Sequence, residues 1–200
     1  MDEAGIILAI RGGNRKNSGE IQPMRATLSV GSMILGASVI VAGQSSLDGR
    51  TEVQLERLFP NATTYSPKQS APPHYKVFGP DGSGHQILLG VAFWTTEIEP
   101  LERGYDGPIK ILVGMNLQGI LTGVVVSEHH EPYGYFSVDR RQFAAQFAGK
   151  DIRDPFQVGS DIEAVSRASI SIASATRAIR NSARRMARQL LAPPSDATNK

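Results

Sequence analysis

The sequence predicts an α+β domain in which an antiparallel sheet is built from hairpins and helices flank it at both ends of the chain. Two pairs of apolar, β-branched segments are each joined by a short turn that contains glycine, which is typical of β-hairpins. A helical pattern precedes these pairs and a longer one follows them. With 200 residues, of which 40% are hydrophobic, the chain has enough apolar side chains for the core of a single domain.

The first predicted element is a helix at residues 51–59, where apolar side chains recur close to helical spacing until Pro60 interrupts them. A proline-rich loop follows at 66–73. The first hairpin then joins a strand at 74–78 to a strand at 86–94, because two apolar runs surround a Pro-Asp-Gly turn.

The second hairpin joins strands at 109–115 and 119–126, both rich in β-branched residues. A short helix is predicted at 142–147 and a long one at 174–191. Apolar side chains recur every three or four residues along the long helix and form one stripe. The stripe consists of Ile172, Ala175, Ile179, Ala183, Met186 and Leu190.

Residues 1–43 resemble a secretory signal peptide. A segment with several basic residues precedes an uncharged, mostly apolar run at 26–42, and small and polar residues follow it. We therefore expect export to the periplasm, with cleavage near Gly43. The run is also close to the length that spans a bilayer, so an uncleaved N-terminal anchor is the alternative. Met24 is a second candidate start of the chain.

Composition excludes several classes of site. The chain contains no cysteine, which excludes disulfides, iron–sulfur clusters, Cys-ligated zinc and Cys nucleophiles. The net charge is only +2, and we expect no nucleic-acid partner. The long helix carries a set of arginines that we interpret as its solvated face, with docking to an acidic redox partner or an anionic lipid as the alternative. They are Arg177, Arg180, Arg184, Arg185 and Arg188.

The segment 163–171 is a hydroxyl-rich turn that leads into the long helix. Unpaired backbone N–H groups at a helix start, together with serine hydroxyls, suit a phosphate or another anion. The alternative is that these serines serve only as helix caps.

Five segments in a fixed order precede this turn and carry a resemblance to a known family. They are 58–62 (LFPNA), 104–109 (GYDGPI), 112–116 (LVGMN), 119–123 (GILTG) and 128–132 (EHHEP). Together they resemble the periplasmic FMN-binding domain of the NosR/NirI regulators of denitrification, a relative of the flavin subunits of the Rnf and sodium-pumping NADH:quinone reductase complexes. The resemblance covers roughly residues 51–191, and we expect one such domain at 44–192 with a disordered tail at 193–200.

In those relatives the last motif reads Asp-x-x-Ser-Gly-Ala-Thr-x-Ser/Thr, and a flavin transferase attaches FMN to its Thr through a phosphoester. Here Glu163 stands in place of Asp, Arg167 in place of Gly and Ser169 in place of the modified Thr. The residues that match are Ser166, Ala168 and Ser171. The resemblance thus implies FMN as cofactor, and it leaves open covalent attachment through Ser169, non-covalent binding and loss of the flavin. A positive φ at Arg167 would cost stability or block the phosphate, whereas its guanidinium could also bind that phosphate.

Four further residues are candidates for the flavin site. The resemblance implies that His129, His130 and Glu131 line the pocket and that Tyr105 lies on a loop near the flavin. For His129, His130 and Glu131, the alternative is a loop whose side chains form local hydrogen bonds. For Tyr105, the alternative is an aromatic side chain in a turn that packs on the sheet. We expect no metal, since adjacent residues of a strand point to opposite faces. His74 and His85 are isolated, and we expect both at the surface.

The resulting hypothesis is an exported FMN-binding protein of periplasmic electron transfer. We expect an electron carrier rather than an enzyme that turns over a substrate, with a membrane-bound redox protein as electron donor. The first alternative is a degenerate flavin domain that acts as a binding or regulatory module. A small flavin reductase is the second, and no acid–base constellation in the sequence argues for it.

Overall fold

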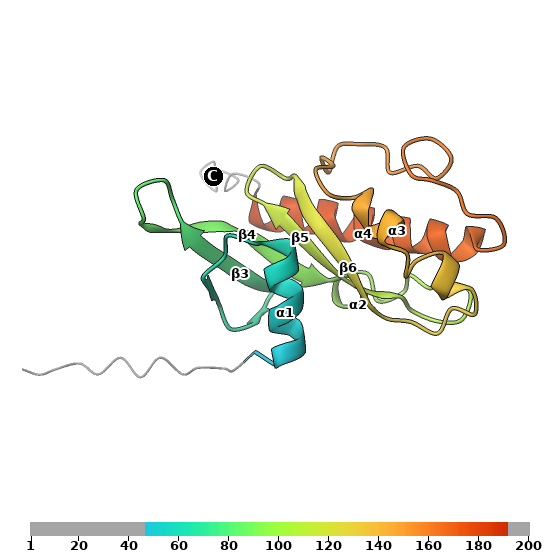
Figure 1. Cartoon of the computed structure of the whole chain (residues 1–200), viewed down its shortest axis with the longest axis horizontal. Coiled ribbons are helices and arrows are strands. Elements are labelled where there is room, and N and C mark those ends of the chain that lie inside the picture. The colour runs from blue at the N-terminus through green and yellow to red at the C-terminus, as the bar shows by residue number, and fades with distance from the viewer. Residues whose placement is uncertain (1–46, 192–200) are drawn as a thin grey trace, which may run out of the picture. The chain divides into compact units, whose positions relative to one another are not determined.

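The computed structural model describes residues 47–191 (Figure 1). The predicted signal segment at 1–43 and the tail at 193–200 lie outside the described residues. Within 47–191, no helix has the length and apolar character needed to cross a bilayer.

The structure has one antiparallel sheet with flanking helices, as predicted. The helices cover both faces of the sheet. The helices are α1 (Gly49–Leu58), α2 (Thr95–Ile98), the 3₁₀ turn η1 (Gly134–Phe136), α3 (Arg141–Ala145) and α4 (Ser169–Leu190). The strands are β1 (Thr64–Tyr65), β2 (Gln69–Ser70), β3 (Pro73–Pro80), β4 (Gln86–Trp94), β5 (Lys110–Asn116) and β6 (Leu121–Glu128). The strand order is β1-β3-β4-β5-β6, and β2 pairs with β3 beside this path.

Both predicted hairpins are confirmed. In the first, β3 pairs with β4, and in the second β5 pairs with β6, with Val113 opposite Val124. Gly119 lies in the β5–β6 turn at a φ of +81°, which an L side chain rarely adopts. The sequence did not predict β1, β2 or α2, because elements of two to four residues are too short to show a periodicity.

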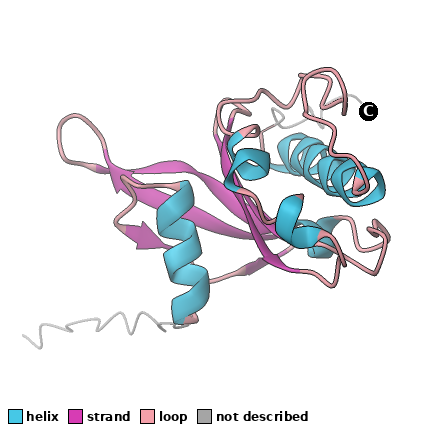
Figure 2. Cartoon of the chain, turned by 45° about the vertical axis from the view of Figure 1, so that its right-hand side comes forward, coloured by secondary structure: helices cyan, strands magenta, loops and turns pink. Residues whose placement is uncertain are grey.

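The alternation of side chains along the central strands builds two cores. Phe93 and Val113 point to the face covered by α4, whereas Ala92 and Leu112 point to the face covered by α1. All four side chains are fully buried. Figure 2 shows α1 and α4 as the helices that cover these faces. Complete burial of a large apolar side chain stabilises the fold by about 1.5–3 kcal/mol, so this alternation fixes the register of the hairpins.

The α1 face is shaped by two glycines opposite Phe59. A Cβ at Gly90 would lie 3.0 Å from Cε1 of Phe59, and a Cβ at Gly114 would lie 3.0 Å from its Cε2. Phe59 is 5% exposed. Its ring packs directly on the backbone of β4 and β5 at these two glycines. A Cβ would also meet the carbonyl oxygen of Met115 at Gly90 and the hydroxyl of Thr122 at Gly114, so close approach from several sides is the reason that these positions carry no side chain.

The predicted helix at 174–191 begins earlier, at Ser169. The apolar stripe is confirmed, since Ile172, Ala175, Ile179, Ala183 and Met186 are fully buried. The sequence placed the start too late because the first turn contains two serines, which weaken the apolar pattern. The correction places Ser169 at the first position of α4 and Ser171 at its third.

The arginines of α4 do not form a purely solvated face. The guanidinium of Arg177 lies 2.7 Å from Glu102, and that of Arg185 lies 3.0 Å from Glu99. Arg184 donates two hydrogen bonds to backbone carbonyls of the segment that precedes α4. Three of these arginines therefore hold α4 to neighbouring segments, which the helical pattern could not reveal.

His74 is buried, contrary to our expectation, with 4% of its surface exposed. Its Nδ1 lies 2.8 Å from the carbonyl oxygen of Pro72, so Nδ1 carries the proton and donates it. His85 lies at the surface, as expected, in the β3–β4 turn.

Candidate functional site

A pocket of about 300 Å³ lies at the N-terminus of α4. It is bounded by the loop before β5, the loop after β6 and the first turn of α4, three segments far apart in the sequence. The lining residues are Tyr105, Pro132, Tyr133, Arg167, Ala168, Ser169, Ile170 and Ser171.

Glu131 ties these three segments together. Its carboxylate accepts hydrogen bonds from the backbone N–H groups of Tyr105, at 3.1 Å, and Asp106, at 3.0 Å. The Ser171 hydroxyl donates a further hydrogen bond to the same carboxylate. Glu131 is 6% exposed, and hydrogen bonds to a buried carboxylate are strong. Glu131 therefore links the two loops to the start of the helix.

The first turn of α4 offers backbone donors to the pocket. Helix geometry leaves the N–H groups of Ser169, Ile170 and Ser171 without an acceptor inside the helix. Ala168 precedes the helix, and its methyl side chain cannot accept a hydrogen bond from these N–H groups. Ser169 and Ile170 are exposed, and their uncapped N–H groups, with the positive end of the helix dipole, favour an anion at this position.

The two serines of this turn differ in access. Ser171 is 4% exposed and its hydroxyl is engaged by Glu131. Ser169 is exposed and lines the pocket. Of the two hydroxyls, only that of Ser169 is open to a ligand.

Arg167 adopts a left-handed backbone conformation, with a φ of +68°. A non-glycine residue in this region costs about 1–2 kcal/mol. The exposed Arg167 side chain lines the pocket beside Ser169. Because glycine adopts this conformation without strain, the backbone here has the form that a glycine in the same position would favour.

Two aromatic rings stand at the rim of the pocket. Tyr105 is 69% exposed and Tyr133 is 46% exposed. Tyr133 also contacts Phe136, with ring centroids 5.4 Å apart. Sequence reasoning missed Tyr133, Pro132 and Ile170 as pocket residues. Tyr133 follows Glu131 by two positions, and an aromatic residue directly beside that motif is the sequence signal that could have found it.

The remaining candidate residues do not line this pocket. Ser166 and Glu163 are exposed on the segment before α4, and His130 is exposed on the loop after β6. His129 has a supporting position. Its Nδ1 accepts a hydrogen bond from the backbone N–H of Glu131 at 3.0 Å, so Nε2 carries the proton and donates it to Asp139 at 2.7 Å.

His129 thus holds the Glu131 backbone through a tautomer that its two neighbours determine. The structure brings together Tyr105, Glu131, Arg167, Ala168, Ser169 and Ser171. The side chains of Glu163, Ser166 and His130 are not among those that line the pocket.

Residues 104–184 match the family model of the FMN-binding domain. The matched segment contains every residue that lines the pocket, and it supports FMN as the cofactor. No curated protein matches the chain.

Proposed function

Starting from an FMN-binding domain, we propose that this chain is an exported electron carrier of the periplasm, similar to the FMN-binding domain of the NosR/NirI regulators. The observation that carries the proposal is the uncapped start of α4, with the accessible Ser169 beside two exposed tyrosines. Bound FMN would supply electron transfer in one- or two-electron steps, and the protein supplies position and electrostatics.

The residues at the start of α4 fit the phosphate of FMN. The backbone donors of Ser169 and Ile170 and the guanidinium of Arg167 border the same pocket, and all three groups favour a negative charge. Arg167 therefore both carries the strained φ and offers a cation to the phosphate. In this proposal the cation compensates for the lost glycine.

The tyrosine rim fits the flavin ring system. Tyr105 and Tyr133 expose large aromatic surface on two different loops, and aromatic side chains favour stacked or edge contacts with planar rings. Glu131 positions both loops relative to the helix, but its carboxylate is occupied by three donors. We assign Glu131 a positioning role.

We propose Ser169 as the site of covalent attachment. A flavin transferase would join Oγ of Ser169 to the FMN phosphorus of flavin adenine dinucleotide, break the bond between the two phosphates and release AMP, which takes up the hydroxyl proton. Ser169 is the accessible hydroxyl of the first turn, whereas Ser171 is buried against Glu131.

The second candidate function is a flavin-free binding or regulatory module. It is favoured by Arg167 at a φ of +68°, because its side chain leaves less room for a phosphate to reach the backbone N–H groups at the start of α4. For the electron carrier we propose a membrane-bound redox protein as the electron donor. For both candidate functions we propose a secretory signal within residues 1–43 as the route of export.

The intact mass of the exported protein, co-expressed with a flavin transferase, tests the proposal. We expect a mass increase of one FMN less one water, yellow colour that persists after denaturation, and loss of both in Ser169→Ala. The matched control is Ser166→Ala, an exposed serine that does not line the pocket, and it should remain modified. Unmodified protein whose yellow colour is released on denaturation would establish non-covalent FMN. Colourless protein that fails to bind added FMN would establish the second candidate.

A further inference from the structure

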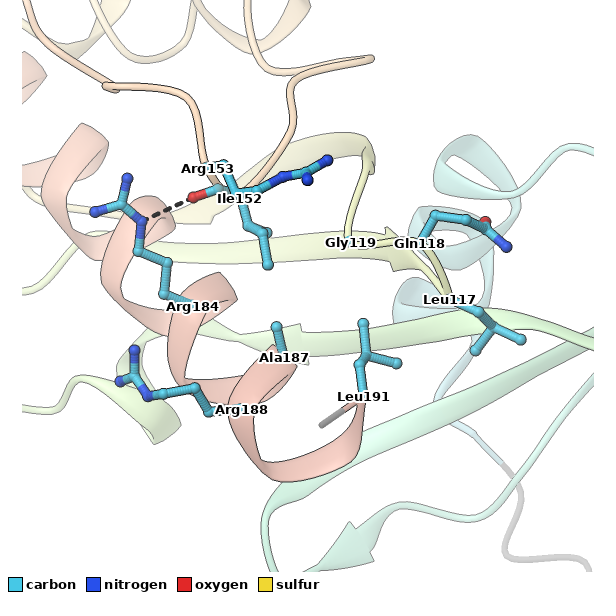
Figure 3. A pocket seen from close by; sticks show the side chains of 9 residues that line it. All are labelled: Leu117, Gln118, Gly119, Ile152, Arg153, Arg184, Ala187, Arg188 and Leu191. Carbon is cyan, nitrogen blue, oxygen red and sulfur yellow. Dashed lines mark hydrogen bonds between the residues drawn. The ribbon is translucent and has the colours of Figure 1, made fainter. Parts of the chain in front are cut away.

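A second pocket lies at the opposite end of α4 (Figure 3). Its residue Arg188 lies about 28 Å along the helix from Ser169. Its volume is about 670 Å³, within the range of roughly 300–1,000 Å³ that small-molecule sites occupy. The lining residues are Leu117, Gln118, Gly119, Ile152, Arg153, Arg184, Ala187, Arg188 and Leu191. None of them belongs to the proposed FMN site.

The floor of this pocket is apolar and comes from three segments. Leu117 follows β5 and is 40% exposed, Ile152 lies on the loop before α4, and Leu191 follows α4. Figure 3 shows the side chains of Ile152, Ala187 and Leu191 directed toward one space. Apolar surface that converges in this way gains free energy when an apolar group covers it.

The rim carries positive charge. Arg153, Arg184 and Arg188 line the pocket, and no carboxylate lines it among the residues the structure describes. Arg153 is paired with Asp151, so its charge is largely compensated. In the described part of the chain, Arg184 and Arg188 form no ion pair within 4.0 Å. Their two charges exceed the half charge of opposite sign at the C-terminal end of a helix.

The walls are held in place by hydrogen bonds. Arg184 donates to the carbonyl oxygens of Ile152, at 2.8 Å, and Asp154, at 2.7 Å. The N–H of Ile152 donates to the carbonyl of Gly119 at 3.0 Å, which joins the β5–β6 turn to the same loop. The pocket is therefore formed before any ligand arrives, which lowers the entropic cost of binding.

From this combination we infer that the pocket binds an aliphatic anion: a hydrocarbon chain on the floor formed by Leu117, Ile152 and Leu191, with a carboxylate or phosphate head at Arg188 and Arg184. A phospholipid and a free fatty acid share this chemistry. The apolar floor adds nothing to the binding of a fully hydrated ion such as inorganic phosphate, and the arginine rim adds nothing to the binding of an uncharged chain.

The test is a titration of the full chain with decanoate and with decyl phosphate, followed by NMR of the backbone amides. We expect saturable shifts centred on Gly119, Ile152 and Leu191. Decanol, which lacks the charge, and inorganic phosphate, which lacks the chain, should each bind about tenfold more weakly or not at all. Sedimentation with phosphatidylglycerol vesicles, compared with phosphatidylcholine vesicles, then distinguishes a membrane lipid from a dispersed amphiphile as the source.

Two substitutions probe the two halves of the site. Arg188→Gln should weaken decanoate binding about tenfold, whereas Arg57→Gln, an exposed arginine on α1, should leave it unchanged. Leu117→Asn should weaken decanoate and decanol alike, and its control is Val53→Asn, at an apolar side chain of similar exposure on α1.

Equal affinity for decanoate and decanol would overturn the assignment of the head group. Shifts that map outside the pocket, or binding that Arg188→Gln does not change, would overturn the site itself. None of these readouts depends on FMN. The inference is therefore tested independently of the proposed function.

Discussion

At the scale of single residues, Arg167 combines an unfavourable backbone conformation with a position at the proposed phosphate site. We expect Arg167→Gly to raise the free energy of unfolding by about 0.5–1 kcal/mol, because relief of the strain exceeds the entropy that glycine adds to the unfolded chain. The same variant should bind FMN about tenfold more weakly if the guanidinium holds the phosphate. Urea unfolding and fluorescence titration with FMN measure the two effects.

The matched control is Arg140→Gly, at an exposed arginine with a φ of −69°. This φ carries no strain that glycine could relieve, so the added flexibility of the unfolded chain should lower the free energy of unfolding. Tighter binding of FMN by Arg167→Gly would instead mean that the arginine obstructs the phosphate.

Glu131 is the second residue on which the site depends. Glu131→Gln replaces one acceptor oxygen with an N–H donor, which then faces the backbone N–H of either Tyr105 or Asp106. We therefore expect a loss of about 1–3 kcal/mol in the free energy of unfolding. The control is Glu128→Gln, at a carboxylate whose ion pair with Lys110 is exposed, and its effect should stay below about 1 kcal/mol. Equal losses in both variants would show that Glu131 does not organise the two loops. Urea unfolding measures both.

At the scale of the elements, the contact between α1 and the sheet depends on bare backbone at Gly90 and Gly114. We expect Gly90→Ala to lower the free energy of unfolding by about 1–3 kcal/mol, since its Cβ would meet the carbonyl of Met115 and the ring of Phe59. Gly82→Ala is the control, because the described residues leave the space around its Cβ open, and it should change stability by less than about 0.5 kcal/mol. A mild effect of Gly90→Ala would mean that α1 shifts easily on the sheet.

Helix α4 connects the two sites that we propose. Its apolar stripe is buried against the sheet, its first turn borders the FMN pocket and its last turns border the arginine-rimmed pocket. The arginines between these ends bind the segment that follows α2 and the loop that precedes α4, so one rigid helix fixes both pockets.

At the scale of the whole molecule, surface carboxylates make stability depend on acid pH. Hydrogen bonds from the Arg153 side chain and backbone lower the pKa of Asp151 from 3.8 to about 2, and hydrogen bonds from Thr51 lower the pKa of Asp48. A carboxyl whose pKa is lowered by folding contributes stability above its unfolded pKa, and this contribution is lost as the pH falls through the folded pKa. We therefore expect stability to fall between about pH 4 and pH 2.

Unfolding by urea at a series of pH values measures this dependence. Asp151→Asn should flatten the decline between about pH 4 and pH 2, and Arg153→Gln, which removes the largest cause of the shift, should flatten it similarly. A decline that is unchanged in both variants would assign the acid sensitivity to other groups.

The fold could be predicted from the sequence because its elements are defined by local patterns. The Pro-Asp-Gly turn and the β-branched runs gave both hairpins, and the stripe from Ile172 to Met186 gave the buried face of α4. The misplaced start of that helix and the buried His74 have one cause, since polar residues leave no periodicity and their burial depends on distant partners. The resemblance singled out several of the residues that meet in the site, but not Tyr133, which enters it only through the loop after β6.

The sequence by itself determined the hairpin-built sheet, the two helical ends and the hydroxyl-rich start of α4, because these are properties of neighbouring residues. Only the tertiary structure decided that Ser169 is accessible while Ser171 is occupied by Glu131, that His129 supports a loop, and that arginines rim a second pocket. Each of these facts depends on contacts between segments separated by tens of residues, and such contacts exist only once the sheet has brought the segments together.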